Sequence, residues 1–575
     1  MLKKLGKMEK AIWQVADVPQ PQLNTIMGSH GLPRPIGLYL VSHGITAEKI
    51  KSYFDPSLKE LSSPFDLPGM EAAAERLWKA VANKEKILIH GDYDVDGITS
   101  AVLLQNTLEA NGALTDVFIP HRFDDGYGFT SSTLEKVISS TGCTLIVTVD
   151  CGISSFDAVD TAKSRNVDII ITDHHEPQGG VPAAFSVINP KVHPKLSSLH
   201  ILSGAGVCFK LCQGFIEYGK KNKLGGGSFD IFDHLDIVSL GTVADIVPLV
   251  GENRILVKNG LNTLSKQSRP GIRALCEISG MNSSVIKTTD ITFSLAPRLN
   301  AAGRLGDPYV AYKLLNSKSI IEAGNHSETL NNYNMERQNK EEIILNEAKK
   351  LIESSIDVTK RTIIISGENW HQGVIGIVAT RLVKIYNRPV IVFSVTNGEA
   401  LGSARGIPGF NLIEILKSCS GIVERYGGHP MAAGILIKTG NLGRFTEIFE
   451  RMAEETATES VKSPSIRIDG EVEIKELDDE FFRYLEQLEP FGQSNSYPIF
   501  VLRNLNPTKL LPAAIAHSRG VLRDSNGNSI SFIAFNRHTS TMPKSARWDV
   551  VATPSLNIYN NNVSKQLQIV DAIDA

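Results

Sequence analysis

The stretch KILIHGDYDVDGIT, residues 86–99, organises the expected fold of this chain. Its apolar run 87–89 is typical of a buried strand, and the run 98–108 is typical of an amphipathic helix. The connection between them carries one imidazole and three carboxylates, at His90, Asp92, Asp94 and Asp96. These carboxylates would repel one another unless a cation neutralised them, and an oxygen-rich site with one imidazole suits Mg²⁺ or Mn²⁺.

Two simpler interpretations compete for this stretch. Aspartates after a strand often cap a helix or form a turn, so one such residue alone predicts little. The spacing of the aspartates up to Gly97 also matches the start of a calcium-binding loop. However, position 103 is Leu where that loop needs a glutamate, and a strand rather than a helix precedes it. The calcium-loop interpretation therefore fails on its context.

Length and composition set the class of protein. The 575 residues are enough for three or four domains, and the net charge of −3 excludes a global basic field. A nucleic-acid partner would have to be held by local clusters of Arg and Lys. Six scattered cysteines form no zinc-like pairs and indicate a reducing compartment. With no signal peptide and no membrane-spanning run, we expect a cytoplasmic enzyme without a membrane partner.

Strand-like and helix-like segments alternate from about residue 76. The expected strands are 87–89, 116–119, 145–149 and 168–172, and the expected helices are 98–111, 130–140 and 154–164. This rhythm predicts an α/β fold with a parallel sheet and helices on both faces. Functional sites in such sheets lie beyond the carboxyl ends of the strands.

Acids and histidines follow three of these strands. Asp150 ends the third strand, and Asp173-His174-His175 ends the fourth. Asp245 stands further on, inside an otherwise apolar stretch. Each residue alone could be a cap, but the set favours a metal site over capping. Two divalent ions that share Asp150 would polarise a phosphoryl group and activate water for in-line displacement.

These spaced motifs resemble the DHH phosphoesterase superfamily, and within it the RecJ family of bacterial single-strand-specific 5′→3′ exonucleases. The resemblance covers nearly all of the chain. It implies two ions, Mn²⁺ or Mg²⁺, one held by His90, Asp94 and Asp150. It implies that the other is held by Asp96, Asp150, His174 and Asp245. It further implies that His175 faces the scissile phosphate and that Asp92 is a supporting acid.

Two arginine motifs are candidates for binding the substrate phosphate. Arg122 follows a strand in PHRFDDGYG, and Arg304 closes LNAAGR, which also contains Asn300. An Arg in a Gly-rich loop can bind phosphate through two hydrogen bonds. Surface ion pairs are commoner uses of arginine, but Arg304 resembles the family's substrate contact.

A polar, helix-forming segment over 317–353 predicts a long helix that joins two lobes. The second lobe contains WHQGVIG, GSAR and the expected Gly-rich loop GGHPMAAG, which together resemble the DHHA1 domain. That likeness implies that Ser403 and Arg405 contact the 5′ end or the backbone of the DNA strand. It also implies that His371 and His429 line the cleft.

The pattern after about residue 463 changes to short strands and turns, which predicts a small barrel of the OB type. Such a barrel suits single-stranded DNA. Its basic candidates are Lys509, Arg519, Arg523, Arg537, Lys544 and Arg547. The expected domains are a helical lead-in (1–75), the DHH catalytic domain (76–316), a linker helix (317–353), the DHHA1 domain (354–457) and the OB-like domain (458–575).

The favoured hypothesis is a two-metal 5′→3′ exonuclease that degrades single-stranded DNA to mononucleotides in repair and recombination. The family implies single-strand-binding protein and a RecQ-type helicase as partners. One alternative is a DHH phosphodiesterase of short oligonucleotides or cyclic dinucleotides, which would not require the barrel. Another is a silent DNA-binding scaffold, which the presence of every expected metal ligand disfavours.

Overall fold

The computed structural model describes residues 11–122, 125, 128–225, 229–281, 285–355, 360–456, 465–513, 516–559 and 562–575. The chain forms two compact units. The larger unit comprises Trp13–Ala296, Tyr312–Gly324 and Ile466–Ala575. Of the described residues, the smaller unit comprises 11–12, 297–311, 325–355, 360–456 and Ser465. The expected boundary between the last two domains, at 457–458, lies outside the described residues.

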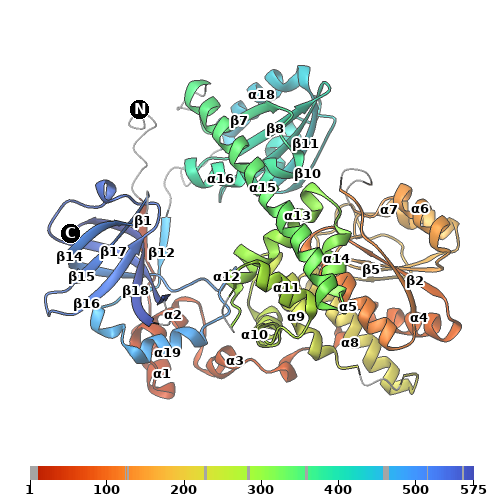
Figure 1. The fold of residues 1–575 in the computed structure, drawn as a ribbon, viewed down its shortest axis with the longest axis horizontal. Helices are drawn as coiled ribbons and strands as arrows, with labels where there is room; N and C mark the ends of the chain where they lie inside the picture. Colours follow the sequence, from red (N-terminus) through yellow and green to blue (C-terminus); the bar gives the residue numbers. More distant parts are fainter. Residues whose placement is uncertain are drawn as a thin grey trace. The chain divides into compact units, whose positions relative to one another are not determined.

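The larger unit contains a five-stranded, wholly parallel sheet, which confirms the predicted fold class (Figure 1). Its strand order is β3 (Leu114–Phe118), β2 (Lys86–Gly91), β4 (Leu145–Val149), β5 (Asp168–Thr172) and β6 (Ser186–Ile188). The sequence predicts the first four, but the three-residue β6 is too short to give a pattern. The chain moves from β2 outward to β3 and then returns to β4 on the other side. The carboxyl ends of β2 and β4 therefore flank the point where ligands bind in such sheets.

Helices cover both faces of this sheet, as Figure 1 shows. One face packs against α6 (Ser131–Thr141) and α7 (Phe156–Ser164), and the other against α4 (Met70–Asn83), α5 (Val95–Ala110) and α8 (Gly204–Asn222). Helix α9 (Leu235–Ala244) packs on α5 and α8. The helical layer continues with α10 (Gly251–Ser265), α11 (Pro270–Ile278), α12 (Thr288–Asp290) and α14 (Tyr309–Asn316).

The C-terminal part of this unit is a closed barrel, as predicted. Its strands are β14 (Phe500–Ala513), β15 (His517–Arg523), β16 (Ser529–Ala534), β18 (Asn562–Asp574) and β17 (Trp548–Tyr559), and β17 pairs back to β14. The two-residue β13 (Gly470–Glu471) pairs in parallel with β14, and α19 (Asp479–Gln487) contributes to the same core as the barrel.

The N-terminal helices share one hydrophobic core with this barrel. Leu23 and Tyr39, from α1 (Gln20–His30) and α2 (Arg34–Ser42), belong to the same buried cluster as Phe500 and Trp548. Helix α3 (Ile50–Phe54) adds Ile50, and β1 (Ile12–Val15) pairs with β12 (Ser465–Ile468). The sequence predicts a lead-in of helices here, but neither β1 nor this shared core.

The smaller unit is built on a mixed sheet. Its order is β10 (Arg425–His429), β11 (Ala432–Lys438), β9 (Glu399–Arg405), β8 (Val390–Thr396) and β7 (Ile363–Glu368). One face packs against α16 (Gln372–Tyr386) and the end of the long α15 (Ile320–Ser355), and the other against α17 (Leu412–Ser418) and α18 (Leu442–Thr456). The prediction of a Gly-rich loop for GGHPMAAG is wrong, because its glycines lie in the paired strands of the hairpin β10–β11.

Candidate metal centre and nucleic-acid contacts

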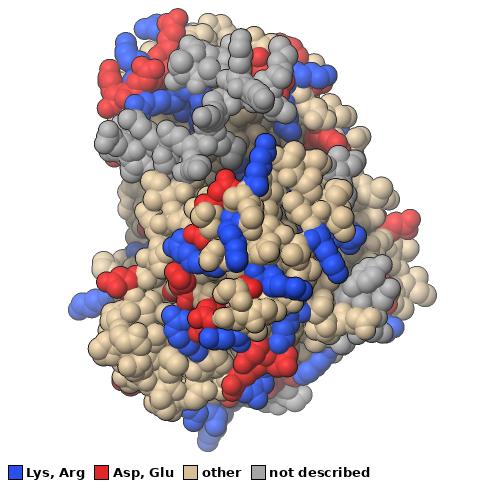
Figure 2. Space-filling view, turned by 90° about the vertical axis from the view of Figure 1, so that its left-hand side faces the viewer, with Lys and Arg blue, Asp and Glu red and all other residues tan. Residues whose placement is uncertain are grey.

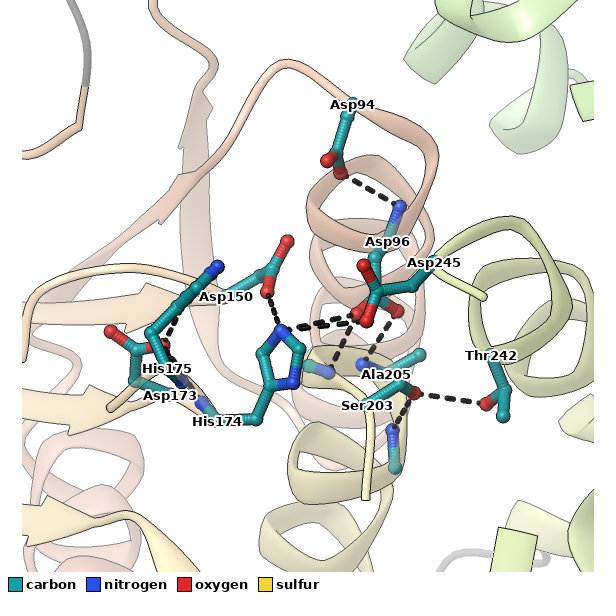
Figure 3. Close-up of polar contacts among 12 residues, drawn as sticks. Asp94, Asp96, Asp150, Asp173, His174, His175, Ser203, Ala205, Thr242 and Asp245 are labelled. Carbon is teal, nitrogen blue, oxygen red and sulfur yellow. Dashed lines mark hydrogen bonds and ion pairs between the residues drawn. The ribbon is translucent and has the colours of Figure 1, made fainter. Parts of the chain in front are cut away.

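The predicted acids and histidines of the larger unit meet at the carboxyl edge of the parallel sheet. His174, which follows β5, is central to the group (Figure 3). Its Nε2 atom lies 3.2 Å from Asp150 Oδ1, 3.5 Å from Asp245 Oδ2 and 4.0 Å from Asp96 Oδ2. Four elements therefore contribute to one cluster: the turn after β4, the turn after β5, the start of α5 and the end of α9.

A second cluster lies beside the first and shares Asp150 with it. Ligand atoms of Asp92, Asp94 and Asp150 lie within 4.8 Å of one another. Asp94 is also the N-cap of α5, where its Oδ1 accepts hydrogen bonds from the backbone of Asp96 and Gly97. The capping interpretation is thus correct for one oxygen of Asp94, while the other oxygen remains for a cation.

His90, which the family resemblance assigns to the same ion as Asp94 and Asp150, is fully buried near the end of β2. The His90 ring packs against Phe118 and Phe129, and its Nδ1 is 3.7 Å from Cys151 Sγ. Burial lowers the pKa of His90 to about 4, so the ring is neutral and its Nε2 can act as a ligand.

His175 is positioned by a residue that the sequence prediction left out of the site. Asp173 Oδ1 accepts a hydrogen bond from His175 Nδ1 at 2.7 Å and also accepts the backbone N–H groups of His174 and His175. Burial opposes the charge of His175, but Asp173 raises its pKa to about 9. The Asn189 side chain fixes this turn by donating to the His175 carbonyl at 2.9 Å. Asp173 belongs to the motif Asp173-His174-His175, whereas nothing in the sequence around Asn189 indicates a role in the site.

Asp96 is held by the beginning of α8. The backbone N–H groups of Gly204 and Ala205 donate to its two oxygens at 2.6 and 2.9 Å. Ser203 caps this helix and also bonds Thr242 of α9, at 2.9 Å between the two hydroxyl oxygens. Sequence reasoning missed this support because backbone donors have no side-chain signature.

The electrostatics of the cluster disfavour charged carboxylates. Burial, and then the neighbouring carboxylates, raise the pKa of Asp92 and Asp96 to about 7 and that of Asp245 to about 9. The same causes raise the pKa of Asp150 well above its ordinary range. Burial, and then the charge of His175, lower the pKa of His174 to about 3, so its ring is neutral.

The cluster has the properties of a site for two divalent cations. Four buried atoms of the predicted ligands make no hydrogen bond to any described residue: His90 Nε2, Asp150 Oδ1, His174 Nε2 and Asp245 Oδ2. Buried polar atoms are otherwise nearly always satisfied, so these four are available to a cation. Carboxylate oxygens with a few imidazoles match the preference of Mn²⁺ and Mg²⁺.

Without divalent ions, we expect the protein to lose stability as the pH rises through about 7 and about 9, the folded pKa values of Asp96 and Asp245. Both values exceed the ordinary aspartate value, so the folded state binds extra protons and loses that advantage as they leave. His175, with its raised pKa, acts in the same direction. Thermal melting in EDTA should show a lower midpoint near pH ~9.5 than near pH ~7. Saturating Mn²⁺ should remove the difference, and equal midpoints in EDTA would contradict these protonation states.

A second group of predicted residues meets in the smaller unit, around the start of α16. His371 is the N-cap of this helix, and its Nδ1 accepts the Gly373 N–H at 3.1 Å. Arg304 Nη1 donates to the Gly373 carbonyl at 3.4 Å. A methyl group on Gly376 would lie 3.0 Å from both Arg405 Nη2 and Ser403 Oγ. Two guanidinium groups and a hydroxyl therefore surround one helix N-terminus, an arrangement suited to phosphate.

Regular helices and strands position the other residues of this group. Arg304 and Asn300 lie in α13 (Ala296–Leu305), not in a Gly-rich loop, and their spacing of four places them on one helix face. His429 is exposed on the edge strand β10, in register through Ala432 with Arg405. Ser403, Arg405 and His429 therefore share one face of the sheet.

The remaining basic candidates are more dispersed. Arg122 lies over the ring of Tyr93, with its guanidinium carbon 5.4 Å from the ring centroid, next to the metal-site acids. Residues 123, 124, 126 and 127 of its motif lie outside the described residues. On the barrel, Arg537 is paired with Asp571 at 2.8 Å. Lys509, Arg519, Arg523, Lys544 and Arg547 are exposed. Figure 2 shows Lys and Arg interspersed with Asp and Glu on the barrel side, rather than a uniform basic field.

Three domain families match successive parts of the chain. They are the DHH family, N-terminal domain (residues 86–242), the DHHA1 domain (358–455) and the RecJ OB domain (468–571). In the part of the chain that the structure describes, no helix is both long and apolar enough to cross a bilayer.

Curated relatives match over most of their length. The chain is 33% identical over 572 residues to the single-stranded-DNA-specific exonuclease RecJ of Bacillus subtilis, covering 98% of this chain and 71% of that protein. It is 33% identical over 526 residues to the protein of that name in Escherichia coli, covering 88% and 90%. Among solved structures, RecJ of Thermus thermophilus in complex with Mn²⁺ matches with a TM-score of 0.85 at 28% identity, over 99% of this chain and 80% of that one.

Proposed function

Because the chain belongs to the RecJ family of single-stranded-DNA-specific exonucleases, we propose that it hydrolyses single-stranded DNA from the 5′ end and releases mononucleotides. The observation that carries this proposal is the pair of clusters that share Asp150. A shared carboxylate with separate ligands on either side is the arrangement that two-metal phosphoryl transfer requires.

We propose that Asp92, Asp94, Asp150 and His90 hold one ion and that Asp96, Asp150, His174 and Asp245 hold the other. The ions are Mn²⁺ or Mg²⁺, and when bound they supply Lewis-acid stabilisation of phosphoryl transfer. His175 is held toward the same edge by Asp173 and, as a cation, can donate a hydrogen bond to a phosphate oxygen. The group around α16 binds the 5′ end or the backbone of the strand.

Digestion of single-stranded DNA labelled at one end or the other, with and without Mn²⁺, tests this function. We expect the 5′ label to be released first, as a mononucleotide. EDTA should abolish this release, and a duplex of the same sequence should resist digestion. Cleavage confined to oligonucleotides a few residues long would instead support the small-substrate phosphodiesterase. Tight binding without cleavage would support the scaffold.

We expect the Arg405→Gln variant to bind 5′-phosphorylated single strands about 10- to 100-fold more weakly, the value of one charge-assisted hydrogen bond. The affinity for a DNA strand with a 5′-hydroxyl should fall less, because the terminal phosphate is the group that Arg405 would contact. Fluorescence anisotropy with both strands measures the difference. Arg444→Gln, an exposed arginine on α18 across the sheet, is the matched control. Equal losses for both strands would place Arg405 on the internal backbone instead.

We also propose that the enzyme acts in the cytoplasm in DNA repair and recombination. Its six cysteines are free and buried, as a reducing compartment allows. Single-strand-binding protein and a RecQ-type helicase are proposed partners on the family resemblance alone, and co-purification with each would test them.

A further inference from the structure

A lysine lies at the edge of the metal centre on a segment that the sequence pattern did not single out. Strand β6 is parallel to β5, with Ile188 opposite Thr172, so the residues after each strand emerge side by side. Those residues are Asp173-His174-His175 after β5 and Asn189-Pro190-Lys191 after β6. Lys191 therefore stands beside the histidines of the site.

Hydrogen bonds fix the backbone of Lys191 against the site. The side chain of Asn189 donates to the His175 carbonyl at 2.9 Å, and its oxygen accepts the Lys191 N–H at 2.9 Å. One amide thus ties the His175 turn to the lysine. The Lys191 Nζ in turn contacts Glu176, the residue that follows His175 in the chain.

The ion pair of Lys191 is weak and exchangeable. Its Nζ lies 3.5 Å from Glu176 Oε1, and the Glu176 side chain is 60% exposed while that of Lys191 is 22% exposed. Ion pairs with one partner well exposed to solvent contribute little to stability. A phosphate oxygen can therefore replace Glu176 without leaving a buried charge unpaired.

The charge balance of the centre favours a further cation near the substrate. Five carboxylates belong to the clusters: Asp92, Asp94, Asp96, Asp150 and Asp245. Two divalent ions leave one of these negative charges uncompensated before the anionic phosphodiester arrives. His175 is already paired with Asp173. An ammonium group at this edge would lower the repulsion that the substrate meets.

From this arrangement, we infer that Lys191 binds a phosphate oxygen of the single strand beside the scissile bond and exchanges Glu176 for it. The inference rests on the proposed function and adds a substrate-contacting residue outside the family motifs quoted above. Lys195, exposed on the following turn, provides a matched control.

Binding of a phosphorothioate-protected single strand, measured by anisotropy in Mn²⁺ at several salt concentrations, tests the inference. Lys191→Met should weaken binding about tenfold and reduce the slope of log Kd against log salt by about 0.7, the value of one contact with a single strand. Lys191→Arg should retain the slope, and Lys195→Met should match the wild type. The Mn²⁺ concentration for half-maximal activity should not change.

Three outcomes separate the possibilities. An unchanged slope in Lys191→Met would overturn the inference. A shifted Mn²⁺ midpoint with an unchanged slope would also overturn it, because the lysine would then position metal ligands. Failure of the wild type to bind or cut single strands would overturn the proposed function itself. If Lys191→Met melts early, Lys191→Gln and Lys191→Arg give the same comparison.

Discussion

The Asp150→Asn variant is expected to lose about 10³-fold in exonuclease rate, because about 4 kcal/mol of metal-dependent transition-state stabilisation corresponds to that factor. Asp150 is the residue common to both clusters, so its loss weakens both ions at once. Asparagine is the appropriate substitute because Asp150 has a φ of 62°. Asparagine tolerates this left-handed conformation far better than alanine, so the backbone turn is retained.

Single-turnover cleavage of a 5′-labelled strand, with Mn²⁺ varied over a wide range, measures this effect. Asp157→Asn, an exposed aspartate on α7, controls for the change in net charge. The melting midpoint in EDTA should not fall, since burial and the neighbouring carboxylates already disfavour a charge at Asp150, and asparagine carries none. Activity within tenfold of the wild type at saturating Mn²⁺ would rule out Asp150 as the shared ligand.

The Gly204→Ala variant is expected to lose about 10²-fold in activity, although Gly204 has no side chain to offer a ligand. A methyl group there would lie 2.4 Å from Asp150 Oδ1 and 2.6 Å from Asp150 Cβ. Gly204 also donates its N–H to Asp96 at 2.6 Å, so a shift of the helix start would move a second proposed ligand. The substitution therefore displaces the site without removing a functional group.

Gly206→Ala is the matched control in the same helical turn. Its methyl group would meet the Leu202 side chain at 3.1 Å, a contact that a flexible side chain can relieve. The activity of both variants should be compared across Mn²⁺ concentrations, with melting measured in parallel. A Gly204→Ala protein with wild-type activity would show that the centre tolerates movement of Asp150.

The predictable part of this protein follows from the regularity of parallel sheets. Alternating strands and helices place every strand end on one edge, so His90, Asp150 and Asp173-His174-His175 could be expected together from sequence alone. Asp245 could be added only as an acid in an apolar stretch. Its distance from the other ligands depends on how α9 packs on α5, which the sequence does not show. The OB-type barrel could be expected from the density of short strands.

The unpredicted part depends on groups that leave no side-chain pattern. The N–H donors of Gly204 and Ala205 come from the backbone. Asn189 and Lys191 follow a strand of three residues, too short for periodicity to detect. Arg304 was expected in a loop because LNAAGR contains glycine, yet packing keeps it helical despite that residue's low helix propensity.

The shared core of the N-terminal helices and the barrel has a consequence for biosynthesis. Tyr39 bonds Asn495, a residue 456 positions further along the chain. At roughly 5–20 residues per second, the ribosome needs about 20–90 s to add the second partner after the first. During that interval the apolar faces of α1 and α2 have no barrel to cover them, so we expect chaperones to bind the nascent chain until the barrel has emerged.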